Sequence, residues 1–233
     1  MSAPTAGRPI ALLFDLDGTL VDTIELLLSS VRHAFAERAT RRPGGLAPSD
    51  AEWIAGIGTP LRAQLSAYAR DDADLAALVD SYRAYQREHH DRLTRCYDGI
   101  VDVVRALKAR GHPTAIVTSK ADDIAHRTLA HVGLAPLMDV VVGVDATTRH
   151  KPDPEPVLFA LDRLGGYAPA EALFVGDSPH DVRAGNAAGV ATVAALWGPF
   201  SREVLDAATP TYRIRRIAEL LPIVERFEGG CRV

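Results

Sequence analysis

The feature that most constrains this chain is an apolar run that ends abruptly in two carboxylates. Residues 10–14 (IALLF) carry no polar side chain and are followed at once by Asp15-Leu16-Asp17-Gly18. A short apolar run without alternation predicts a strand buried on both faces, as in a parallel sheet. Ligands of such sheets bind at the carboxyl ends of the strands. Two acids there are costly unless a cation or a shared proton lies between them, so a divalent cation or a shared proton is expected.

The order of the other predicted elements indicates an α/β protein. Alternation of strand and helix implies right-handed crossovers and a Rossmann-like parallel sheet covered on both faces. A short helix from Ser201, an edge strand near Tyr212 and an amphipathic helix over 215–226 are expected to complete the chain. The alternating strands are predicted at 113–117, 139–143, 172–176 and 190–194, and the helices at 100–110, 121–131, 152–164 and 181–188.

One long stretch interrupts this alternation. Asp22 can cap a helix that runs to about Ala39. Residues 48–95 then contain helical patterns and no convincing strand. A purely helical block after one strand is not how a regular alternating sheet continues. We therefore expect a core domain of residues 1–20 and 96–233 and an inserted all-helical cap domain of residues 21–95, with cap helices at 49–55, 60–70 and 72–92.

Composition excludes several classes of protein. The net charge of −4 and the scattered basic residues argue against a nucleic-acid partner. The two cysteines, Cys96 and Cys231, are far apart and lack metal-ligand spacing, which fits a reducing compartment and no disulfide framework. No segment has the length of a signal peptide core or a membrane span. The expectation is a cytoplasmic monomer or homodimer without a membrane partner.

Polar residues recur where other predicted strands and helices meet. Thr118 follows one strand, Asp177 follows another with Asp181 four residues later, and Lys151 precedes a helix. Each has an ordinary structural explanation when taken alone. Thr118 and Asp177 can cap helices, Asp181 suits a first helical turn, and a lysine before proline is usually solvated. The order of these residues after Asp15 and Asp17 is what points to a shared site.

Taken together, these motifs resemble the four motifs of the haloacid dehalogenase superfamily, most of whose members are phosphatases. The resemblance rests on FDLDGTLVDT at 14–23, Thr118, Lys151 and GDSPHD at 176–181. Many members carry a helical insertion directly after the first motif. The resemblance therefore implies a phosphohydrolase with a Rossmann-like core and a helical cap.

The family chemistry assigns roles to these residues. Asp15 is expected to attack phosphorus and form an aspartyl-phosphate. Asp17 is expected to protonate the leaving oxygen and then to deprotonate the attacking water. Lys151 would neutralise Asp15 and the phosphoryl oxygens, and the Thr118 hydroxyl would bind one of those oxygens.

The same resemblance implies Mg²⁺ as the cofactor, because hard oxygen ligands with waters suit this ion. The expected ligands are Asp15, the backbone carbonyl of Asp17, and Asp177. Asp181 would ligate through water or orient the site.

Substrate contacts are predicted on both domains. The amides of Gly18 and Thr19, with Ser119 near them, are expected to meet the phosphoryl group. On the cap, the loop 56–62 is a candidate reader of the substrate. Gly58 would let amides approach an anion, and Arg62 would pair with a carboxylate or second phosphate. A plain helix–helix turn with a solvated Arg62 is an equal alternative, and His89 and His90 are expected on a helix surface.

The resemblance narrows the reaction further. Asp17 argues against a dehalogenase, and Leu26 to Leu28 stand where the sugar phosphomutases carry a histidine. The segments 151–157 and 188–193 resemble phosphoglycolate phosphatases, so a small phosphomonoester like 2-phosphoglycolate is expected. Tyr82-Arg83 and His90-Asp91 resemble inorganic pyrophosphatases of the same branch, which leaves pyrophosphate as the alternative substrate. A phospho-receiver or a non-catalytic binding module is a more distant alternative.

Overall fold

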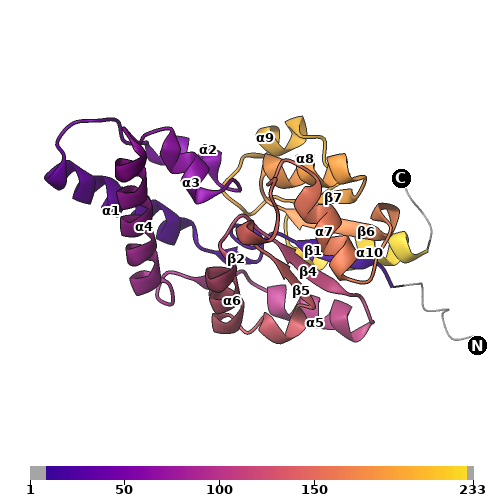
Figure 1. Cartoon of the computed structure of the whole chain (residues 1–233). Coiled ribbons are helices and arrows are strands. Elements are labelled where there is room, and N and C mark those ends of the chain that lie inside the picture. Colours follow the sequence, from indigo (N-terminus) through magenta and orange to yellow (C-terminus); the bar gives the residue numbers. More distant parts are fainter. Residues whose placement is uncertain (1–8, 230–233) are drawn as a thin grey trace, which may run out of the picture.

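The computed structural model describes residues 9–229, and a six-stranded parallel sheet forms its centre (Figure 1). The strand order is β5-β4-β1-β6-β7-β8, and every neighbouring pair is parallel. The predicted α/β class is therefore confirmed. The strands are β1 (Ala11–Phe14), β4 (Thr114–Val117), β5 (Val140–Val142), β6 (Ala172–Gly176), β7 (Ala191–Ala195) and β8 (Tyr212–Ile214).

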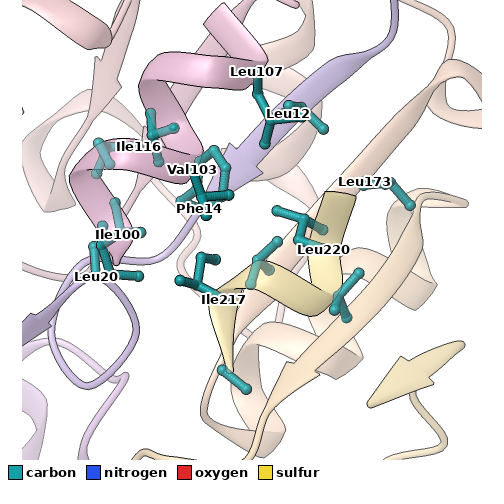
Figure 2. Close-up of a cluster of buried hydrophobic side chains, with 14 of the residues drawn as sticks. Leu12, Phe14, Leu20, Ile100, Val103, Leu107, Ile116, Leu173, Ile217 and Leu220 are labelled. Atoms are coloured by element: carbon teal, nitrogen blue, oxygen red, sulfur yellow. The ribbon is translucent and has the colours of Figure 1, made fainter. Parts of the chain in front are cut away.

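Helices cover both faces of the sheet, as a buried parallel sheet requires. Side chains that alternate along β1 point to opposite faces: Leu12 and Phe14 to one, Ala11 and Leu13 to the other. The first face packs on α5 (Ile100–Ala109), α6 (Asp122–His131) and α10 (Leu220–Glu228), and Figure 2 shows α5 and α10 enclosing it. The second face packs on α7 (Glu155–Arg163) and α8 (Pro179–Ala188), and α9 (Arg202–Ala207) follows β7.

Four helices inserted after β1 form a helical cap beside the sheet (Figure 1). They have a hydrophobic core of their own, which includes Trp53, Leu65 and Leu78. The chain leaves and re-enters the core through a short antiparallel ribbon in which Val21 pairs with Cys96. The cap helices are α1 (Ile24–Arg41), α2 (Asp50–Gly56), α3 (Leu61–Ser66) and α4 (Asp72–His89), and the ribbon is β2 (Val21–Asp22) with β3 (Arg95–Cys96).

Several predicted helix ends are wrong by a few residues. Asp22 lies in β2 and Thr23 takes the N-cap position of α1, although Asp22 Oδ1 still accepts a hydrogen bond from the amide of Ile24, the first residue of the helix (3.3 Å). Helix α3 stops at Ser66 rather than Arg70, and the carbonyl of nearby Tyr68 accepts a hydrogen bond from Arg38 (3.0 Å). The last predicted helix is divided, since a 3₁₀ turn at Ile217–Glu219 precedes α10.

His90 is a clear correction, because it is fully buried rather than on a helix surface. Its Nε2 lies 2.8 Å from the Thr128 hydroxyl of α6, and its Nδ1 lies 2.7 Å from Asp91. His90 therefore ties the end of the cap to the core. The prediction for Cys231 falls outside the described residues. None of the helices within residues 9–229 combines the length and apolar character needed to cross a membrane.

Candidate active site

Three neighbouring strands bring predicted site residues to one edge of the sheet. Strand β1 lies between β4 and β6, so Asp15, Thr118 and Asp177 follow adjacent strands that run in the same direction. The strand order reverses at β1, and this is the position where open α/β sheets bind ligands. Motifs that are far apart in the sequence therefore meet at a single site.

Lys151 reaches the centre of this site from the segment before α7. Its Nζ lies 2.8 Å from Asp15 Oδ1 and 2.6 Å from Asp181 Oδ1, and it also donates to the carbonyl of Val117 (3.1 Å). The side chain is buried. A buried ammonium is tolerated here because two carboxylates and a carbonyl replace its water. Lys151 is therefore not a solvated surface lysine.

Burial dominates the protonation behaviour of the carboxylates. It raises the pKa of Asp15 to about 7, although the Lys151 ammonium acts in the opposite direction. Burial and the nearby carboxylates also raise the pKa of Asp177 well above its usual value. The carboxylates in turn raise the pKa of Lys151 despite its own burial. One ammonium does not compensate this cluster of acids, so the site favours a further positive charge.

The acidic cluster fits a hard divalent cation. Carboxylate oxygens of Asp15, Asp177 and Asp181 lie within 4.8 Å of one another, and all three residues are buried. Asp177 Oδ1 accepts a hydrogen bond from the Thr19 hydroxyl (2.6 Å), whereas its Oδ2 is buried without a hydrogen-bond partner among the described residues. A buried carboxylate oxygen without a hydrogen-bond partner is well suited to bind a metal ion.

Gly18 leaves room for the unpartnered oxygen. A Cβ on Gly18 would lie 2.4 Å from Asp177 Oδ2, and its φ of +84° also favours glycine. The Gly18 amide donates to the carbonyl of Val21 (2.8 Å), and the Thr19 amide to that of Leu16 (3.4 Å). The structure therefore does not present these two amides as free donors for a phosphoryl group.

Asp181 is fixed on both of its oxygens. One faces Lys151, and Oδ2 accepts from the amide (3.1 Å) and the hydroxyl (2.7 Å) of Ser178. Ser178 is the N-cap of α8 and Pro179 its first residue, an order that favours a helix start. Asp181 thus has the geometry of an orienting residue, one of the two roles considered for it.

Asp17 is the acid whose surroundings the sequence did not reveal. Its Oδ1 accepts a hydrogen bond from the Thr23 hydroxyl (2.6 Å) and pairs with the ammonium of Lys120. Lys120 is buried, and its amide donates to the Thr118 hydroxyl oxygen (3.2 Å). Sequence reasoning missed both partners. Lys120 stands two residues after Thr118, at the same strand end, and that position was the available signal.

A pocket of about 500 Å³ lies between the acids and the helical cap. Asp15, Asp17 and Thr118 line its core side. Arg62, Arg83 and Arg87 line its cap side, are exposed, and have no ion pair with any described residue. Unpaired guanidinium groups facing a pocket favour an anionic ligand. Arg62 was predicted for this role, whereas Arg87 was not.

The predicted cap loop contacts the core. The Ser119 hydroxyl donates to the carbonyl of Gly58 (2.6 Å), and both residues line the pocket. A Cβ on Gly58 would lie 2.9 Å from the Ser178 hydroxyl oxygen. Ser119 and Gly58 therefore meet each other at the mouth of the site, and their direct contact with substrate stays a prediction.

A loop after β7 completes the wall around Asp177. Trp197 Nε1 donates to the carbonyl of Thr19 (3.0 Å), and a Cβ on Gly198 would lie 2.5 Å from Asp177 Cβ. Sequence reasoning assigned no role to this loop. A tryptophan-glycine pair one residue beyond the end of β7 was the signal that could have drawn attention to it.

The chain has close relatives in sequence. The family model of the haloacid dehalogenase-like hydrolases matches residues 12–195. The pyrophosphatase PpaX of Bacillus velezensis is 37% identical over 219 residues, which cover 94% of this chain and 98% of that protein. The pyrophosphatase PpaX of Bacillus pumilus is also 37% identical, over 212 residues that cover 91% of this chain and 94% of that protein.

Solved structures share the fold. A crystal structure described as that of a predicted phosphoglycolate phosphatase from Haemophilus somnus has a TM-score of 0.82 at 24% identity, and the match covers 95% of this chain and 99% of that one. Likeness at this identity shows the fold alone. The four motifs, their meeting at one sheet edge and the matching family model together establish that the chain belongs to the haloacid dehalogenase-like hydrolase family.

Proposed function

We propose that the protein is a Mg²⁺-dependent phosphohydrolase whose preferred substrate is inorganic pyrophosphate. The observation that carries this proposal is a buried Asp15–Lys151–Asp177–Asp181 cluster that lies across the pocket from three arginines without an ion pair within residues 9–229. The cluster suits one phosphoryl group, and the arginines suit a second anionic group. The sequence relatives named as pyrophosphatases support the same choice.

The cation would be held by Asp15, Asp177 and the backbone carbonyl of Asp17. When bound, it neutralises charge on the phosphoryl group and the attacking carboxylate. Lys151 supplies a second positive charge at Asp15 Oδ1. Both contributions matter because a phosphate dianion repels a carboxylate nucleophile.

The residues of the chain divide the reaction into two displacements. An Asp15 oxygen forms a bond to phosphorus while the bond to the leaving oxygen breaks, and Asp17 gives its proton to that oxygen. A water molecule then attacks the aspartyl-phosphate and loses a proton to Asp17. This step releases phosphate and restores the Asp15 carboxylate. The helical cap limits the access of bulk water to these steps.

The direct test is phosphate release with Mg²⁺ from pyrophosphate, 2-phosphoglycolate, sugar phosphates and nucleoside monophosphates. We expect the highest kcat/KM for pyrophosphate. A clear preference for 2-phosphoglycolate, which also carries two anionic groups, would replace pyrophosphate as the substrate while keeping the mechanism. Absence of release from all four classes, with Mg²⁺ bound, would refute the proposed function.

Asp15→Asn tests the nucleophile. The amide nearly keeps the size of the side chain but cannot form the aspartyl-phosphate, so activity should fall by at least about 10³-fold. Circular dichroism should show an unchanged fold. Near-normal turnover by this variant would remove Asp15 from its assigned role.

A further inference from the structure

The two contacts of Asp17 converge on the same oxygen. Thr23 Oγ1 donates to Oδ1 at 2.6 Å, and Lys120 Nζ pairs with that atom from the end of β4. Among residues 9–229, no hydrogen-bond donor contacts Oδ2. The carboxylate also lines the pocket. One oxygen is thus fixed by two donors, and the other is available to a ligand.

The side chain of Thr23 binds Asp17 in place of its usual helix-capping partner. It occupies the N-cap position of α1, where a threonine oxygen normally accepts a hydrogen bond from a helix amide. Here the side chain makes no capping bond, and its hydroxyl donates to Asp17 instead. Thr23 is fully buried, so its hydroxyl has no solvent alternative. Its side chain therefore serves Asp17 rather than the helix.

Lys120 contributes from a different part of the fold. It is largely buried, and within residues 9–229 its ammonium has no carboxylate partner other than Asp17. Its amide meanwhile donates to the Thr118 hydroxyl oxygen. A residue held at both ends can set the rotation of the Asp17 carboxylate relative to Thr118 and Asp15. Lys151 cannot orient the Asp17 carboxylate, since its ammonium forms ion pairs with Asp15 and Asp181.

From this geometry we infer that Lys120 and Thr23 are positioning residues that hold Asp17 Oδ1, so that Oδ2 carries the proton delivered to the leaving oxygen. The inference rests on the proposed function, in which Asp17 is the general acid. General acid catalysis is worth about 10²–10⁴-fold, and it matters most when the leaving group is poor. A misplaced Oδ2 should therefore slow the reaction most for substrates that have a poor leaving group.

The test compares phenyl phosphate, which has a poor leaving group, with p-nitrophenyl phosphate, which has a good one. For Lys120→Met we expect kcat/KM for phenyl phosphate to fall about 10²-fold, while kcat/KM for p-nitrophenyl phosphate falls by less than about fivefold. The comparison of kcat/KM isolates formation of the aspartyl-phosphate, because the later attack by water is the same for both esters. Thr23→Val should show the same pattern, and Thr23→Ser, which keeps the hydroxyl, should restore the wild-type ratio.

Adding Lys120→Met to Asp17→Asn should cause no further loss on phenyl phosphate, because residues that act as a unit are not additive. An equal loss of kcat/KM on both esters would overturn the positioning role. Should Lys120→Met fail to fold, the Thr23 pair gives the same readout. A wild-type protein inert toward both esters and pyrophosphate would instead refute the proposed function.

Discussion

At the scale of single residues, the balance of buried charge explains why this site would bind a cation. Asp15, Asp177 and Asp181 are buried together, and Lys151 contacts only the first and the last of them. Asp177 Oδ2 has no hydrogen-bond partner in the part of the chain that the structure describes. Desolvation of such a group favours its protonated form, so metal and protons compete for the same oxygens.

This competition predicts that stabilisation by Mg²⁺ increases with pH. The pKa of Asp15 is raised from 3.8 to about 7, so below pH 7 the metal-free site holds a proton that Mg²⁺ must displace. Apparent affinity should fall about tenfold per pH unit for each proton released. The metal-free protein should behave in the opposite way. Its stability should decrease as the pH rises from about 4 to about 7, because the folded state, with its raised carboxyl pKa, then binds more protons than the unfolded state.

Thermal unfolding with and without Mg²⁺ at pH 5.5, 6.5 and 7.5 measures this effect. The increase in Tm caused by Mg²⁺ should be largest at pH 7.5. Asp177→Asn is the matched variant, since it removes one ligand charge and should reduce the Mg²⁺ effect at every pH. A Tm shift that is independent of pH would contradict proton–metal competition.

At the scale of elements, the start of α8 has both a structural and a functional task. The Ser178 hydroxyl oxygen caps the helix by accepting a hydrogen bond from the Asp181 amide. In return, the amide and the hydroxyl of Ser178 both donate to Asp181 Oδ2. This capping motif of α8 thereby fixes the carboxylate that binds the Lys151 ammonium. Helix α2 begins with an equivalent capping box at Ser49 and Glu52, but it lies in the cap and has no site residue in that motif.

The two capping boxes allow a matched prediction. Ser178→Ala and Ser49→Ala should each lower the free energy of unfolding by about 1 kcal/mol. Only Ser178→Ala should also lower kcat, because only it releases a residue that contacts Lys151. Denaturant unfolding and steady-state kinetics on both variants make the comparison. Equal kinetic losses would show that the capping box of α8 has no special part in the site.

Sequence reasoning predicted correctly which residues lie together where those residues follow a strand directly. Asp15, Thr118 and Asp177 follow buried apolar strands, and parallel topology alone brings such strand ends together. It failed where partners depend on tertiary packing: Lys120 and Thr23 meet Asp17 only because β4 and the start of α1 converge on it. His90 reads as an ordinary polar residue near a helix end, yet α6 covers it. Helix ends also shifted where neighbouring backbone groups found other partners, as at Tyr68.

At the scale of the whole molecule, the site is divided between the core and the cap. The core supplies the acids and Lys151, and the cap supplies the arginines that face them across the pocket. The Ser119–Gly58 hydrogen bond joins the two parts on one side of the site. On the other, Arg127 of α6 donates to the carbonyl of Arg87 (3.0 Å) and to Asp91 (2.9 Å). Because these contacts join the cap to the core on both sides of the pocket, we expect opening and closing of the cap to accompany substrate binding.

The cap arginines should select for a second anionic group. Arg83→Gln should raise KM for pyrophosphate by about tenfold or more, because a charge-assisted hydrogen bond is worth about 1.5–3 kcal/mol. The variant should leave KM for phenyl phosphate unchanged, since that ester has no second anion. Arg92→Gln is the control, because Arg92 is exposed but does not line the pocket. A parallel increase for both substrates would assign Arg83 to cap structure rather than recognition.

Cap closure should depend on Gly58. An added Cβ would lie 2.9 Å from the Ser178 hydroxyl oxygen, and φ at this residue is +97°, so Gly58→Ala should hold the cap away from the core. Gly44→Ala is the matched control: it has a similar φ of +85°, but its nearest neighbour is Arg70 at 3.9 Å, within the cap. Small-angle scattering with Mg²⁺ and a phosphate analogue should show a larger radius of gyration for Gly58→Ala alone. Because closure excludes water and brings the arginines to the substrate, kcat/KM for pyrophosphate should fall in the same variant. Identical scattering from both variants would mean that closure does not pass through the Gly58 contact.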